Sequence, residues 1–366
     1  MKKNVVYFIF VLFLMILPKT LKGSGMRSDR KPAPQGRAER VLFTDSAGRQ
    51  VEIPAKITRI TASGSLAQMF LIAIAPDLLC TVTSAFPQQE AEFMPGYLAN
   101  LPAAGQFYGA ANINLEEIAA IGPEIVIDVG ESKDTIAEDM DAISKAVAVP
   151  TVHIAAGLRS TPEAFRTLGG LLGRQEKGEA LAAFCEKTLA WADRIMAQAG
   201  NNKKPALYCL GKQGLNVLAA GTFHTEVLDK LADNRAVVSN PASRGTGNET
   251  NIEQLLLWDP EVILFGFNSV YDSAGSDPVW RQMRAVRNGA YYEVPQGPHN
   301  WMGGPPSINR YLGMLWMLKI FYPEYADFDL YAEVAEYYRL FYSFELSQER
   351  FNALTARSLQ PRGPAL

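Results

Sequence analysis

Asn-Leu-Glu-Glu-Ile-Ala-Ala-Ile-Gly-Pro-Glu-Ile-Val-Ile at residues 114–127 has a counterpart in Asn-Ile-Glu-Gln-Leu-Leu-Leu-Trp-Asp-Pro-Glu-Val-Ile-Leu at residues 251–264. In each copy the Asn can cap a short helix whose first turn is acidic, and the Pro then separates that helix from a β-branched strand. The copies lie much further apart than the repeats of a solenoid, so they predict two pseudo-equivalent lobes. The alternative is a chance match between two ordinary helix–strand units.

The sequence around both copies alternates strand-like apolar runs with helical ones. The pattern begins near Arg40 and resumes from Pro205 to about Val294. Strands that alternate with short helices indicate parallel α/β units, and 366 residues suit two such domains. In the first half we expect strands over 58–63, 78–83, 124–129 and 151–154, and helices over 66–74, 115–121 and 136–147.

A helical segment separates the two halves. Thr161-Pro162-Glu163 has the pattern of a helix start, and the glycines at 169, 170 and 173 are expected to break this helix. A second helix is expected over 176–199, where apolar residues keep helical spacing. With a rise of ~1.5 Å per residue it spans about 35 Å, which is long enough for a strut between two lobes.

The first 25 residues have the pattern of a secretory signal peptide. Two lysines precede an unbroken apolar run over 5–17, and small residues follow. This run is short for a bilayer span, which needs about 20 residues, although an uncleaved anchor is the alternative. Residues 26–39 are expected to form a disordered leader. No Cys precedes Cys80, so we expect no lipid-modified Cys at the cleavage site and a periplasmic protein.

Composition and motifs narrow the class of function. The net charge of -3 comes without a basic stripe, so a nucleic-acid partner is not expected. Three cysteines share no metal-ligand spacing and are interpreted as buried hydrophobes. The three histidines fall on separate elements, which argues against a bare-metal site. The sequence lacks the nucleophile, phosphate-loop and zinc motifs of common enzymes, and no enzyme activity or cofactor is expected.

In several stretches the chain resembles the class III solute-binding proteins of ABC importers, the iron-siderophore, haem and cobalamin type. The order and spacing of these stretches are more specific than any one of them, and together they cover residues 40–325, nearly all of the mature chain. The stretches are 41–54, 59–63, 114–118, 123–127, 168–173, 252–263 and 285–295.

This resemblance implies two Rossmann-like lobes joined by a single long helix, with the ligand in the cleft between the lobes and little lobe motion on binding. It also implies a metal chelate as ligand, an ABC permease with its ATPase as partner, and a monomer. Glu116 and Glu253, the third position of each repeat copy, match the family's permease-docking carboxylates, with helix-terminus electrostatics as the alternative. The expected divisions are a first lobe over 40–160, an interlobe segment over 161–202, a second lobe over 203–325, and a helical extension over 326–366 packed on the second lobe.

Ligands of open α/β sheets bind beyond the carboxyl ends of the strands, which selects loops in both lobes. Arg310 is expected in the first turn of a helix capped by Ser307, where a cation opposes the macrodipole, so it needs either an anionic ligand or an internal carboxylate. His299 is a candidate axial ligand to a chelated metal, with a backbone-bonded loop histidine as the alternative. The full set of candidate ligand contacts is Ser63, Ser65, Phe86, Phe107, Tyr108, Arg244, Phe267, Tyr271, His299, Trp301 and Arg310.

Three other functions remain open from the sequence. A molybdate- or tungstate-type oxyanion receptor would also use Arg310 and helix N-termini. An enzyme or a two-lobe module that binds only protein would belong to another class. A metal-bearing ligand that copurifies with the protein would separate solute binding from the last two.

Overall fold

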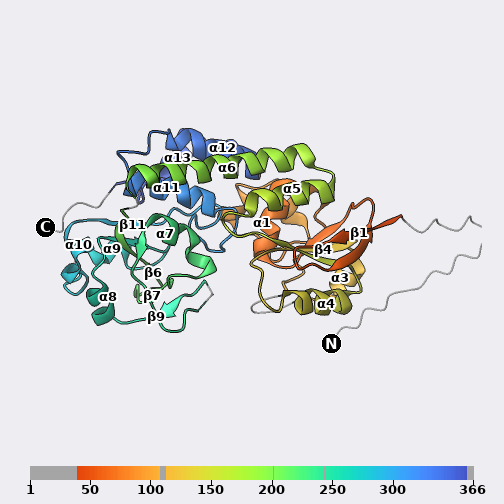
Figure 1. The fold of residues 1–366 in the computed structure, drawn as a ribbon, viewed down its shortest axis with the longest axis horizontal. Helices are drawn as coiled ribbons and strands as arrows, with labels where there is room; N and C mark the ends of the chain where they lie inside the picture. The colour runs from red at the N-terminus through yellow and green to blue at the C-terminus, as the bar shows by residue number, and fades with distance from the viewer. Residues whose placement is uncertain (1–38, 108–112, 201, 243–244, 361–366) are drawn as a thin grey trace, which may run out of the picture. The chain divides into compact units, whose positions relative to one another are not determined.

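Two main sheets form in the two halves of the chain (Figure 1), and residues 40–44 and 50–54 pair as a separate two-stranded antiparallel sheet. The computed structural model describes residues 39–107, 113–200, 202–242 and 245–360, so the expected signal peptide and nearly all of the expected leader lie outside it. The first sheet is parallel and has the order β3-β4-β5. The second has the order β11-β10-β6-β7-β9, with β8 also paired to β6. In the second sheet β6, β8, β10 and β11 are parallel, and β7 and β9 add antiparallel pairs.

The strands and helices fall close to the predicted runs. The strands are β1 (Arg40–Thr44), β2 (Gln50–Pro54), β3 (Ile60–Ala62), β4 (Ile125–Gly130), β5 (Thr151–Ala155), β6 (Pro205–Leu210), β7 (Asn216–Val217), β8 (Asp233–Asn234), β9 (Asn248–Glu249), β10 (Val262–Phe265) and β11 (Tyr291–Glu293). The α-helices are α1 (Ser65–Ile74), α2 (Gln88–Ala91), α3 (Leu115–Ile121), α4 (Ile136–Val147), α5 (Thr161–Leu172), α6 (Gln175–Gln198), α7 (Glu226–Leu231), α8 (Ile252–Trp258), α9 (Tyr271–Ala274), α10 (Arg284–Arg287), α11 (Arg310–Phe321), α12 (Leu330–Tyr342) and α13 (Gln348–Thr355). The strand expected over 78–83 is instead a short 3-10 turn followed by isolated bridges.

The repeat is the same structural unit in both halves. Asn114 caps α3 by accepting the backbone N–H of the third helical residue at 3.1 Å, and Asn251 caps α8 in the same way at 2.8 Å. Both helices end in a left-handed residue, Gly122 in α3 and Asp259 in α8, whose N–H donates to the carbonyl four residues earlier. The chain then enters β4 or β10. Matching caps at both ends show that the likeness between the two stretches is structural.

Helix α6 is the long helix predicted to join the lobes, and its bounds differ from the expected range by one residue at each end. Helix α5, however, runs through Gly169 and Gly170 and ends only before Gly173, which adopts a left-handed conformation. Close packing of α5 on α6 explains the glycine at 178 in α6, because a Cβ there would come within 2.6 Å of the carbonyl oxygen of Phe165. The glycines therefore permit a close helix contact and do not break α5.

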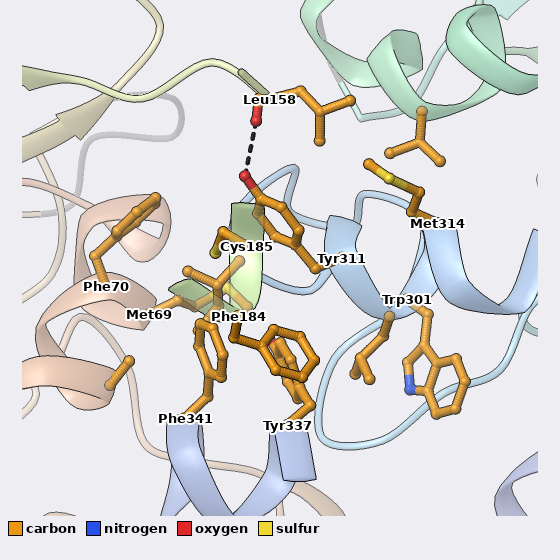
Figure 2. Close-up of a cluster of buried hydrophobic side chains, with 14 of the residues drawn as sticks. Met69, Phe70, Leu158, Phe184, Cys185, Trp301, Tyr311, Met314, Tyr337 and Phe341 are labelled. Atoms are coloured by element: carbon orange, nitrogen blue, oxygen red, sulfur yellow. Dashed lines mark hydrogen bonds between the residues drawn. The ribbon is translucent and has the colours of Figure 1, made fainter. Parts of the chain in front are cut away.

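One apolar core runs from β3 in the first sheet through α1, α6, α11 and α12 to β10 in the second. Figure 2 shows its central part, where Tyr337 and Phe341 of α12 face Phe184 of α6, near Phe70 of α1. The C-terminal extension was expected to pack on the second lobe, but α12 packs against α1 and α6 as well as α11. Aromatic side chains on several of its faces allow it to do so, and a shared core of this kind opposes independent motion of the lobes.

Candidate functional site

A cavity of about 180 Å³ lies at the carboxyl ends of β3 and β4. Such a position is where open α/β sheets bind ligands. The first half of the chain supplies one wall, and residues well along the second half supply the other. The lining residues are Ser63, Gly64, Ser65, Leu66, Ala67, Gln106, Asp128, Val129, Gly130, Glu131, Lys133, Ile136, Phe223, His224 and Pro306.

The N-terminus of α1 opens onto this cavity. Gly64 is the N-cap and supplies no side-chain cap, and the first turn of α1 holds no acidic residue. The first backbone N–H groups of a helix have no partner within it and carry a partial positive charge. Ser63 and Ser65, both predicted from the sequence, lie beside them. This wall therefore offers hydrogen-bond donors to an anionic group.

A buried polar network forms the floor of the cavity. The Ser63 hydroxyl donates to one carboxylate oxygen of Asp128, and the other oxygen lies 2.6 Å from Nδ1 of His153. The remaining ring nitrogen of His153 lies 3.0 Å from the hydroxyl of Ser132. Parallel register places Asp128 directly beside His153 on neighbouring strands. Sequence reasoning missed Asp128, although an acidic residue inside the apolar run of β4 is an available signal.

The opposite wall comes from a turn that sequence reasoning did not select. Phe223 and His224 belong to a 3-10 turn just before α7, and they face the first half of the chain across the cavity. Nδ1 of His224 is buried without a hydrogen-bond partner among the described residues. Burial and the nearby Arg310 guanidinium lower the pKa of His224. A neutral imidazole of this kind has a lone pair that can accept a hydrogen bond or bind a metal.

Arg310 does not line the cavity, which corrects the expectation that it contacts the ligand. Its side chain is 1% exposed and pairs with Glu226. Its other donors reach the carbonyl oxygens of Ser307 at 3.1 Å and Ala156 at 3.1 Å. The internal carboxylate, which was the alternative, is therefore present. Helix α11 begins at Arg310 itself, with Asn309 rather than Ser307 at the N-cap.

Two of the predicted aromatic contacts are core residues instead. Trp301 is fully buried, and its indole N–H donates to the carbonyl oxygen of Gly297 at 3.2 Å. Tyr271 is 5% exposed and packs edge-on against Tyr291 within the second half. Burial of Trp301 in the shared core and of Tyr271 in the core of the second half corrects the expectation that they face the ligand.

Other candidates lie near the surface but away from the cavity wall. Phe86 and Phe107 are half-buried, and Phe86 packs against the shared core whereas Phe107 packs against a smaller cluster of the first half. Phe267 is exposed and borders a separate hollow beside α13. His299 is mostly buried, with Nδ1 3.8 Å from a carboxylate oxygen of Glu90, and burial lowers its pKa to about 4. These four positions therefore contribute nothing to the cavity wall.

The remaining predictions concern surface and unplaced residues. Glu116 and Glu253 are both exposed, as a docking role requires. Tyr108 and Arg244 lie outside the described residues.

The three cysteines are buried and form no disulfide, which confirms their interpretation as buried hydrophobes. Within the described ranges, no group of three or more His, Cys, Asp or Glu side chains is arranged to hold a metal ion. In that same portion of the chain, no helix combines the length and apolar character needed to cross a membrane.

Comparison with known proteins gives consistent matches. The model of a family described as periplasmic binding protein matches residues 106–298. The Fe(3+)-citrate-binding protein YfmC of Bacillus subtilis is 22% identical over 187 residues, which make up 50% of this chain and 56% of that relative. The chain thus spans a little over half the length of this curated relative.

Solved structures match over more of the chain. An ABC transporter solute binding protein from Sulfurospirillum deleyianum is 26% identical, with a TM-score of 0.77, and the match covers 86% of this chain and 99% of that one. The molybdate-bound periplasmic binding protein MolA of Haemophilus influenzae is 19% identical, with a TM-score of 0.65 and coverage of 84% and 99%. The likeness to MolA concerns the fold alone.

Proposed function

Because this chain belongs to the periplasmic binding protein family, we propose that it is the solute-binding component of an ABC importer. In this role it captures a metal chelate after export to the periplasm and delivers it to a permease and its ATPase. Members of the family bind solutes, and the sequence-based prediction that the chain is not an enzyme is confirmed by this membership. Cleavage of residues 1–25 and docking through Glu116 and Glu253 are parts of the same proposal.

The observation that carries the proposal is the chemistry of the cavity. One wall presents the uncapped N-terminus of α1 with Ser63 and Ser65 beside it, which suits carboxylate or other anionic oxygens. The facing wall presents the imidazole of His224, and burial and the Arg310 guanidinium lower its pKa, so the ring is neutral near pH 7 and carries a nitrogen lone pair. Anion donors on one side and a nitrogen lone pair on the other suit a ligand that combines anionic oxygens with a metal ion.

The size of the cavity favours a compact chelate. Its volume of about 180 Å³ is smaller than the ~300–1,000 Å³ usual for sites that take drug-sized ligands. Among the expected chelates, we therefore favour one of the size of an iron–carboxylate complex over haem or cobalamin. The likeness to the Fe(3+)-citrate-binding protein supports this choice.

A second candidate is a tetrahedral oxyanion. The N-terminus of α1 and the small volume of the cavity favour it, and the fold of the molybdate-bound MolA is similar. The lining holds two carboxylates, Asp128 and Glu131, and one ammonium group, Lys133, and this excess of negative charge disfavours an oxyanion more than a chelate whose metal ion offsets part of its charge. The chelate therefore remains the first choice.

Isothermal titration of the purified protein separates these ligands. Iron(III) citrate, haem, cyanocobalamin, molybdate and tungstate are each titrated into the same preparation, and elemental analysis of protein from its native host identifies any metal that copurifies. We expect iron(III) citrate to bind most tightly. Tighter binding of molybdate would favour the oxyanion receptor, and failure of every ligand to bind would refute the proposal.

A cavity-filling variant tests the location of the site. Gly64 has an extended backbone that any residue can adopt, and a Cβ there would already lie 3.7 Å from the Gln106 side chain. Gly64→Leu should therefore block the cavity and reduce affinity by at least about 100-fold, the cost of losing a few kcal/mol of contacts. Gly170→Leu, at a position with open space around it, is the matched control. Equal affinities for the two variants would place the ligand elsewhere.

A further inference from the structure

The contacts of the buried Arg310 side chain join the two halves of the chain. It belongs to α11 in the second half, and Nη2 donates to the carbonyl oxygen of Ala156, directly after β5 in the first half, at 3.1 Å. Nη1 pairs with Glu226 at the start of α7. The guanidinium of Arg310 therefore binds other residues of the protein, and the side chain reaches across the boundary between the lobes.

Glu226 also belongs to the second half and crosses the same boundary. Its two carboxylate oxygens accept the backbone N–H of Leu158 at 3.2 and 3.1 Å. The carbonyl oxygen of Leu158 in turn accepts the hydroxyl of Tyr311 at 2.7 Å, as Figure 2 shows. The backbone over 156–158 is thus held from both sides by charged and polar groups of α7 and α11. We call the set of Arg310, Glu226 and this backbone segment the interlobe latch.

The interlobe latch also holds one wall of the cavity. The guanidinium carbon of Arg310 lies 4.6 Å from the ring centroid of Phe223, which is a cation–π contact. Phe223 lines the cavity, as does its neighbour His224. The 3-10 turn that carries both residues is closed by a Thr222–Thr225 capping box and leads directly into Glu226. A shift of the ion pair would therefore move this wall relative to the N-terminus of α1.

We propose that Arg310 and Glu226 act as positioning residues that hold the Phe223–His224 wall at a fixed distance from the α1 wall, and so set ligand affinity without touching the ligand. This inference rests on the proposed function, because it assumes that the cavity is the ligand site. It differs from a purely structural salt bridge in two measurable ways. Loss of the latch must change the spacing of the lobes, and it must weaken binding.

The test removes both charges together. Glu226→Gln alone would leave the buried Arg310 guanidinium uncompensated, which is strongly destabilising. The double variant with Arg310→Met and Glu226→Gln avoids an unpaired buried charge and keeps an acceptor for the Leu158 N–H. The control is a double variant with Arg194→Met and Asp327→Asn, which removes an exposed ion pair at 2.7 Å. Circular dichroism verifies that both variants are folded.

Lobe spacing is measured without any ligand by pulsed electron resonance between spin labels at Ala120→Cys and Leu257→Cys. Both positions are exposed, one on α3 and one on α8, and the three native cysteines are buried, so labelling is selective. We expect a narrow distance distribution in the parent and in the control variant, and a broader or shifted one in the latch variant. An unchanged distribution in the latch variant would overturn the inference whatever its affinity.

Affinity for iron(III) citrate is then measured in the same three proteins. We expect the latch variant to bind about 5- to 150-fold more weakly than the parent, the usual range of coupling between separate elements, and the control to bind like the parent. Altered spacing with unchanged affinity, or an equal loss in the control, would refute the positioning role. If the parent binds no ligand of the panel, the proposed function fails, and the distance measurement alone decides whether the latch exists.

Discussion

Replacing Asp128 with alanine removes the acceptor on which the polar floor of the cavity depends. In the parent, Asp128 accepts the Ser63 hydroxyl and faces Nδ1 of His153 at 2.6 Å. Ser63 is 1% exposed and His153 is fully buried, so water that enters from the cavity can replace the lost carboxylate only in part. Asp128→Ala therefore leaves two buried donors without a protein partner.

The expected loss of stability follows from these two donors. A buried donor without an acceptor costs ~1–3 kcal/mol, so two of them cost about 2–6 kcal/mol of the free energy of unfolding. Asp128→Asn should cost less, because its amide oxygen can still accept one of the two bonds. Replacing Asp128, His153 and Ser63 together by Leu, Phe and Ala should restore part of the loss, because no buried donor then lacks a partner.

Urea unfolding followed by circular dichroism measures these differences, provided the slope of the transition is the same in every variant. Asp141→Ala is the matched control, because Asp141 is an exposed partner of Arg49 and should cost less than ~1 kcal/mol. A loss below 1 kcal/mol for Asp128→Ala, or an equal loss for Asp141→Ala, would refute the reasoning. It would mean that the floor of the cavity is open to solvent.

Two further predictions concern partners and pH. Glu116→Lys combined with Glu253→Lys should abolish import in a reconstituted transporter while leaving ligand affinity unchanged. Both side chains are exposed and lie on helices outside the cavity lining. Retained transport would exclude docking through these carboxylates. Burial lowers the pKa of His299 from 6.5 to about 4, so the unfolded chain binds this proton more tightly than the folded chain. The free energy of unfolding is therefore unaffected by this titration above about pH 6.5. It falls by up to about 3 kcal/mol as the pH falls toward 4, because the unfolded chain is protonated first. Urea unfolding of His299→Gln between pH 4 and 7 should show a flatter pH dependence than the parent, and identical slopes would contradict this prediction.

Much of the architecture could be predicted because its signals are local. An Asn, an acidic first turn and a Pro define α3 and α8 wherever they occur, and apolar spacing defines α6 to within one residue at each end. Such features depend on capping and periodicity over a few residues. These local signals were sufficient to predict the two main sheets, the joining helix α6 and the start of α1. They also selected Ser63 and Ser65, which line the cavity.

The composition of the cavity was decided by the tertiary structure. Phe223 and His224 reach it from a turn before α7, whose place depends on the distant contacts of Arg310 and Glu226. Periodicity cannot tell whether an aromatic ring such as Trp301 packs in the shared core or faces the cleft, because both environments are apolar on one side. The sequence by itself therefore determined the two lobes and the edge of the sheet at which the cavity lies. Packing between segments far apart in the chain decided which side chains form the walls, and it turned Arg310 from a candidate ligand contact into a link between the lobes.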